Sequence, residues 1–129
     1  MKTRKNRLRK NGSEEITLKF LQILNIVKLF HWKTTSYATH KATDDLYSKL
    51  NDNIDKYVEV MLGQDGTRLN FSSLKSIPAF EVTTTSQIKK FVDNMKAYLD
   101  KMVIRPDLLN IKDDIINDLN QFLYLLTLH

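Results

Sequence analysis

The chain has 129 residues, of which 42% are hydrophobic and 27% charged. This length suits one domain, and three glycines and two prolines leave little material for a turn-rich all-β fold, so helices are favoured. The lack of cysteine excludes disulfides, thiolate metal sites and cysteine nucleophiles. Because no stretch has the pattern of a membrane span or a secretory signal, we expect a soluble intracellular protein, in the cytoplasm or nucleoid/nucleus, or associated with a virion.

Positive charge is concentrated at the N-terminus. Six of the twenty Lys and Arg residues lie among the first ten positions, whereas the rest of the chain carries fourteen basic and fifteen acidic side chains. We therefore expect residues 1–12 to be a disordered basic tail and residues 13–129 to be the folded domain. The tail could bind nucleic-acid phosphates, or serve as a nuclear-import signal, a contact to an acidic protein or a solubility segment. Its basic residues are Lys2, Arg4, Lys5, Arg7, Arg9 and Lys10.

The first predicted helix spans residues 14–34. Ser13 is a candidate N-cap, and two glutamates follow it in the first turn, where carboxylates suit the helix dipole. Apolar residues then recur at helical spacing, and His31 continues this stripe instead of interrupting the polar face. The stripe consists of Phe20, Leu24, Val27 and His31.

The second predicted helix begins at Thr39 or His40 and ends at Leu62, before the turn sequence GQDG. At 100° per residue, His40 lies within its apolar stripe. Asp55 and Glu59 are one turn apart at the margin of the stripe, so they project side by side where a neighbouring helix or subunit could meet them.

Residues 63–84 form a long connection for so small a domain. A crossover along the length of a bundle explains it, because such a crossover lets the helices on either side run parallel. The third helix is predicted over 86–104, with Val103 among its inward residues, and the fourth over 107–127. The pattern predicts an all-α, ferritin-like four-helix bundle with a long crossover between its second and third helices.

Two histidines and two carboxylates form the candidate metal site. His31, His40, Asp55 and Glu59 offer the nitrogen and oxygen donors that suit divalent iron, manganese or zinc. A bound dication would remove the cost of placing two acids together in apolar surroundings. The alternative is structural, since a histidine on an apolar face is often a hydrogen-bonded core residue and Asp-x-x-x-Glu is common on solvated helices.

The stretch from His31 to Glu59 resembles the Dps family, ferritin-like proteins that protect DNA in starved cells. The resemblance rests on "HW" at the end of the first helix, "H…DDLYS" at the start of the second, and the Asp-x-x-x-Glu pair that begins fifteen residues after His40. The segments "HWKTTSYATH" and "LYLLTL" also look like those of uncharacterised short helical proteins encoded by large DNA viruses.

The Dps resemblance implies a function. His31 and His40 from one subunit and Asp55 and Glu59 from its mate would bind iron across a two-fold interface, with Trp32 beside the site. The protein would form at least a dimer, or the family's twelve-subunit shell. It would oxidise ferrous iron, preferably with hydrogen peroxide, and the basic tail would hold it on DNA without sequence preference.

Two other functions fit the same sequence. One is a non-catalytic helical bundle, structural or associated with nucleic acid as in a virion, that keeps these residues as a hydrogen-bonded pin. The other is a basic-tailed adaptor without metal. A further acidic group on the last helix, made of Asp113, Asp114 and Asp118, is interpreted as a solvated face because the Glu-x-x-His pairs of an intrasubunit di-iron centre are missing.

Overall fold

The structure of the chain is a computed structural model that describes residues 4–74 and 76–128, with side chains described from Gly12 onward. These residues contain four α-helices and no strand, which confirms the predicted helical class. The helices are α1 (Arg4–Lys33), α2 (Tyr37–Asp65), α3 (Thr85–Lys101) and α4 (Pro106–Leu125).

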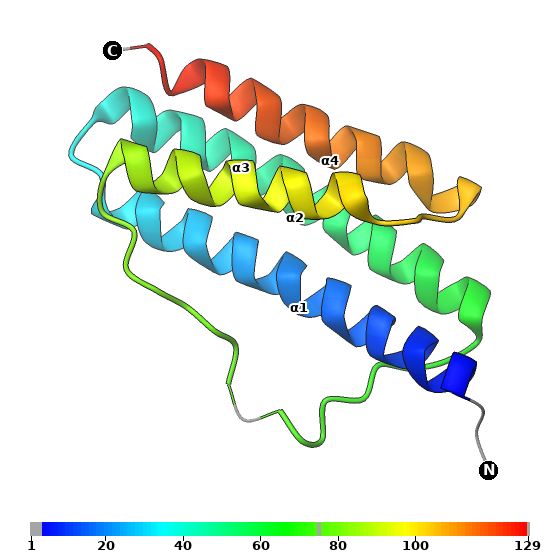
Figure 1. The fold of residues 1–129 in the computed structure, drawn as a ribbon. Coiled ribbons are helices and arrows are strands. Elements are labelled where there is room, and N and C mark those ends of the chain that lie inside the picture. The colour runs from blue at the N-terminus through cyan, green and yellow to red at the C-terminus, as the bar shows by residue number, and fades with distance from the viewer. Residues whose placement is uncertain (1–3, 75, 129) are drawn as a thin grey trace.

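The helices are arranged so that α2 and α3 run in the same direction, and α1 and α4 run in the opposite direction (Figure 1). A three-residue turn joins α1 to α2, whereas residues 66–84 pass along the whole bundle before α3 begins. Helix α2 packs against α1 and α4, and α3 completes the bundle by packing against α4 and α1. The crossover predicted from the length of this connection is confirmed.

Local capping sets the helix boundaries. Ser36 starts α2 because its side chain accepts a hydrogen bond from the Thr39 amide, so this helix begins before the predicted Thr39 or His40. Gly66 ends α2 in the left-handed conformation, with φ of 64°, and its amide donates to the Leu62 carbonyl. Pro106 occupies the first turn of α4, where a missing amide hydrogen has no cost.

Helix α1 begins earlier than predicted. Its backbone includes residues 4–13, so Ser13 lies inside the helix, where its carbonyl accepts a hydrogen bond from the Thr17 hydroxyl at 2.8 Å. The disorder expected for residues 1–12 is therefore not confirmed. Residues 1–3, and the side chains of residues 4–11, lie outside what the structure describes.

The core includes Phe20, Leu24 and Val27 of the stripe predicted for the first helix, and it also includes Ile23 and Phe30, which lie outside that stripe. Its fully buried side chains come from all four helices, and Val82 adds an anchor from the end of the crossover. Val103 was wrongly predicted to face inward: α3 ends at Lys101, and Val103 lies fully exposed in the link to α4. The largest buried side chains include Phe20, Phe30, Leu50, Ile88, Leu99, Ile115, Leu119 and Phe122.

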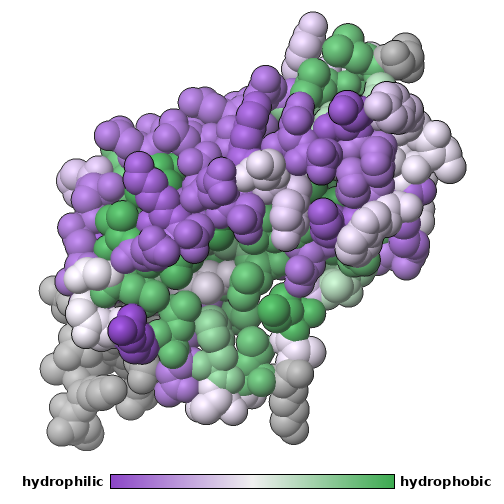
Figure 2. All heavy atoms as spheres, turned by 180° about the vertical axis from the view of Figure 1, so that it is seen from behind, coloured by the Kyte–Doolittle hydropathy of each residue, from purple (hydrophilic) through white to green (hydrophobic). Residues whose placement is uncertain are grey.

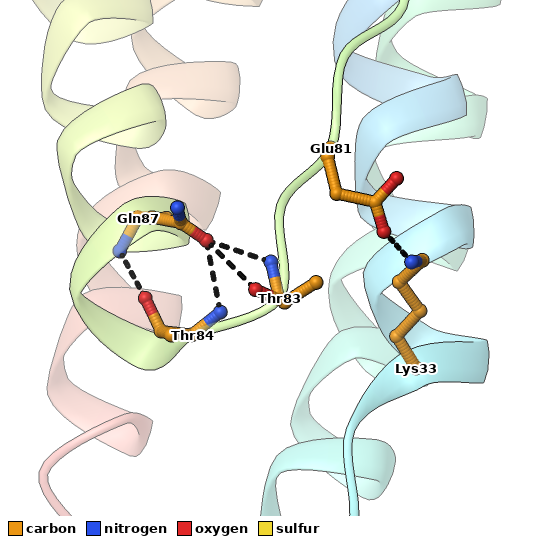
Figure 3. Close-up of polar contacts among 5 residues, drawn as sticks. All are labelled: Lys33, Glu81, Thr83, Thr84 and Gln87. Atoms are coloured by element: carbon orange, nitrogen blue, oxygen red, sulfur yellow. Dashed lines mark hydrogen bonds and ion pairs between the residues drawn. The ribbon is translucent and has the colours of Figure 1, made fainter.

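Hydrogen bonds and an ion pair stabilise the end of the crossover (Figure 3). Glu81 forms an ion pair with Lys33 at the end of α1. Thr84 and Gln87 form a capping box at the start of α3: the Thr84 hydroxyl accepts from the Gln87 amide at 3.1 Å, and the Gln87 side chain accepts from the Thr84 amide at 3.2 Å. The end of the crossover is thus held to α1 through Lys33 and to α3 through Gln87.

The middle of the crossover leaves apolar surface exposed. Seen from behind, polar side chains cover the upper part of the molecule and apolar ones gather below, at the level of α1 and the crossover (Figure 2). In the crossover, Leu74 and Phe80 are exposed, and Phe80 contacts the Phe91 ring of α3 edge-on, with 5.4 Å between ring centroids.

Candidate functional site

The two predicted histidine ligands come together at the turn between α1 and α2. His31 is only 8% exposed, and its Nδ1 lies 3.0 Å from the His40 carbonyl oxygen. In return, Nδ1 of His40 lies 3.0 Å from the His31 carbonyl oxygen. Because a carbonyl oxygen can only accept, each Nδ1 must carry a hydrogen and donate it to the other residue's backbone.

The two imidazole rings stack face to face. Their centroids are 3.8 Å apart and their planes differ by 17°. A metal ion lies close to the plane of any imidazole that binds it, so two stacked, nearly parallel rings cannot both bind the same ion without reorienting. No hydrogen bond joins Nε2 of either ring to another described side chain or backbone group.

Thr43 completes the histidine network. It is fully buried on α2, and its hydroxyl oxygen lies 2.9 Å from Nδ1 of His31. The same hydroxyl has helix carbonyls within reach, those of Thr39 at 3.0 Å and His40 at 2.9 Å. It can therefore donate to a carbonyl while accepting from His31. We did not predict this residue, although its spacing of three from His40 places both on one helix face.

The predicted carboxylates lie elsewhere on α2. Asp55 and Glu59 are exposed, one turn apart, as predicted from their spacing. Fifteen residues separate His40 from Asp55, which is roughly 22 Å along a helix. Within one chain the two pairs therefore do not meet, and the side chains of residues 12–74 and 76–128 contain no group of three metal-binding residues. An iron site between subunits stays a prediction.

Trp32 follows His31 but points outward, with 68% of its surface exposed. Lys28 holds one side of it: its Nζ lies 5.6 Å from the Trp32 ring centroid and 4.6 Å from that of Tyr47 on α2. Such contacts between a cation and aromatic faces are stabilising. They fix the lysine between α1 and α2 and leave most of the indole open to solvent.

The acidic residues of α4 do not act as one cluster. Asp113 and Asp114 are exposed. Asp118 is half-buried and accepts a hydrogen bond from Asn53 of α2 at 2.7 Å. Burial raises the pKa of Asp118, an effect that the Asn53 hydrogen bond partly opposes. Since the fold thereby favours its protonated form, this carboxyl contributes less stability as the pH rises through that pKa.

The residues predicted to contact nucleic acid have side chains outside the described part of the structure: Lys2, Arg4, Lys5, Arg7, Arg9 and Lys10. In the part of the chain that is described, no helix combines the length and apolarity needed to cross a membrane.

Comparison with known proteins gives one family and one phage relative. The model of a family described as "Family of unknown function (DUF5856)" matches residues 31–126. An uncharacterized 14.6 kDa protein from the mobD-ri intergenic region of Enterobacteria phage T4 is 42% identical over 59 residues. This match covers 46% of the chain and 43% of the phage protein, so less than half of that relative is spanned. No solved structure gives a significant match.

These findings correct the Dps assignment, because the family that matches is one of unknown function and not a Dps or ferritin family. The motifs behind the resemblance were short, and in this chain the histidines have a local explanation. Each histidine donates a hydrogen bond to the other's carbonyl oxygen, and together they hold α1 against α2 at the turn, a role that needs no metal.

Proposed function

The chain belongs to the family of unknown function DUF5856, and on that premise we propose that it is a non-catalytic helical bundle that binds nucleic acid through the basic start of α1. The observation that carries the proposal is the separation of charge. Six basic residues lie among the first ten, and the remainder of the chain is close to neutral. Such a segment neutralises phosphates and releases counterions, largely without regard to sequence.

The described part of the bundle gives the two histidines a structural role. The stacked histidines are fully engaged through Nδ1, and no buried side-chain nitrogen or oxygen in the described residues lacks a hydrogen-bond partner. These contacts give the histidine pair a structural role, so the proposal assigns it no catalytic step. The relative encoded by phage T4 fits a role for the chain in a viral setting.

Duplex binding at several salt concentrations tests the proposal. In the variant with Arg4→Gln and Lys5→Gln, we expect affinity to fall about tenfold or more at low salt. The slope of log affinity against log salt should shrink by about two, because each lost phosphate contact removes about 0.9. Fluorescence anisotropy with a labelled duplex measures both quantities.

The matched control removes two charges from α2, with Lys49→Gln and Lys56→Gln. Both lysines are exposed and lie away from the start of α1. The control should bind with nearly the wild-type salt slope. Equal losses of affinity in the two variants would mean that net charge alone governs binding. Unchanged affinity in the variant with Arg4→Gln and Lys5→Gln would contradict the proposal.

A further inference from the structure

Two strongly exposed aromatic side chains flank the turn between α1 and α2. Trp32 is 68% exposed on the last turn of α1, and Tyr37 is 74% exposed on the first turn of α2. Only residues 33–36 separate them, and the ends of both helices are fixed by the histidine pair and the Ser36 cap. Large rings held in solvent on a rigid turn are available to a partner.

The residues around the turn carry more positive than negative charge, although Asp44 and Asp45 lie one turn beyond Lys41 on α2. Residues 16–43 contain four lysines and not one Asp or Glu. Lys28 lies against the Trp32 ring, and Lys41, one turn into α2, is exposed and forms no ion pair with another described residue. Lys33 forms an ion pair with Glu81 of the crossover (Figure 3).

The chemistry around the rings favours nucleobases over an apolar protein surface. The residues between the rings, Lys33 to Ser36, are a lysine and three hydroxyl side chains, so the rings are not joined into a continuous apolar patch. Protein hot spots are usually packed within such patches. Aromatic rings interleaved with cations are instead the arrangement on which single-stranded nucleic acid stacks its bases and places its phosphates.

The geometry points to a stacking platform for single-stranded nucleic acid at the α1–α2 turn, where Trp32 and Tyr37 stack on bases, Lys41 faces phosphates and Lys28 supports the Trp32 ring. This inference rests on the proposed function. It adds to non-specific electrostatic binding of nucleic acid a site that prefers single strands. Twenty-eight residues separate Trp32 from Arg4, roughly 42 Å along α1, so the platform and the basic segment are separate contacts.

Trp32 is the only tryptophan in the chain, so its fluorescence reports on the platform directly. We expect an unlabelled oligothymidylate of about 20 nucleotides to quench the wild-type emission in a saturable manner, and a blunt duplex of equal length to quench it far less. Tyr37→Ala should lower oligothymidylate affinity by about 5- to 150-fold, the loss expected when one stacked base is released. The salt slope should stay unchanged because stacking involves no counterion.

Tyr124→Ala is the matched control. Tyr124 is a comparably exposed tyrosine, at 63%, but it lies on α4 outside the lysine-rich turn. Its removal should leave oligothymidylate binding unchanged. Thermal unfolding of both variants checks that the bundle is intact.

Two failures are distinguishable. If the duplex binds through the basic segment but oligothymidylate neither quenches Trp32 nor responds to Tyr37→Ala, the platform is wrong and the proposed function stands. If the chain binds neither nucleic acid, both are wrong. A Tyr37→Ala variant that changes the sedimentation coefficient instead would assign the rings to contact between copies of the chain and would overturn the platform.

Discussion

At the scale of single residues, His31 and His40 act as one unit. Each donates to the other's backbone and the rings stack, so removing either one also removes the partner's contact. We expect His31→Ala to lower the free energy of unfolding by about 2 kcal/mol or more, because it leaves Thr43 without a partner ring in the core, and His40→Ala by about 1 kcal/mol.

The double variant should cost at least about 0.5 kcal/mol less than the sum of the single variants, as expected for coupled residues. Urea denaturation of the four proteins measures this difference. If the two losses simply add, the reciprocal pair is not a unit.

Ferrous iron separates the two roles of these histidines in the same measurement. A ligand that binds only the folded protein raises the unfolding midpoint by mass action. If the pair is purely structural, anaerobic iron leaves the wild-type midpoint where it was. If the predicted intersubunit site forms, the midpoint rises, and the rise disappears in Asp55→Ala and in Glu59→Ala.

The sequence predicted these four residues as one site and could not show which of them meet. Asp55 and Glu59 are neighbours because spacing along one helix fixes them, and that prediction was right. Whether His31 stacks on His40 depends on how tightly the chain turns between two helices. Spacing alone does not determine this, and Thr43 was missed for the same reason.

At the scale of helices, periodicity predicted every helix, and side-chain caps set where α2 and α3 begin. Ser36 was interpreted as part of a polar break, although a serine three residues before an amide that it can bond is a start signal. Ser13 shows the opposite error, since the same residue type lies inside α1. Local signals of this kind are weak against the packing of a long amphipathic helix.

Two glycines at the end of α2 allow a prediction in which only the backbone differs. Gly63 is helical and Gly66 has φ of 64°, and an added Cβ would meet nothing within 4 Å at either position. Gly63→Ala should therefore stabilise the protein by about 0.5–1 kcal/mol, because alanine has less freedom to lose. Gly66→Ala should destabilise it by about 1–2 kcal/mol, because a Cβ strains the left-handed conformation.

Thermal and urea unfolding of these two variants measure the effect, each serving as the other's control. Shifts of the same sign would mean that the αL cap does not decide where α2 ends, and that the crossover begins there for another reason.

At the scale of the whole molecule, the bundle has two sides of opposite charge. The neighbouring helices α2 and α4 carry ten acidic and four basic residues, whereas the described side chains of α1 and α3 include seven basic and four acidic ones. Outer surfaces on opposite sides of two helix layers are on the order of 20 Å apart. That distance exceeds the Debye length of about 8 Å at physiological salt, so the charges on one side have little electrostatic effect on a molecule bound to the other side.

Nucleic acid should therefore approach the side formed by α1 and α3, and two variants of opposite charge change test this orientation. Lys89→Gln with Lys90→Gln, on exposed positions of α3, should weaken duplex binding several-fold at physiological salt. Asp52→Asn with Asp55→Asn, on the exposed face of α2, should change it less than about twofold, because screening hides those carboxylates from the bound duplex. Anisotropy titrations measure both, and at tenfold lower salt the second variant should begin to bind more tightly. Equal and opposite effects at physiological salt would mean that net charge alone governs binding and that the polarity of the bundle gives no orientation.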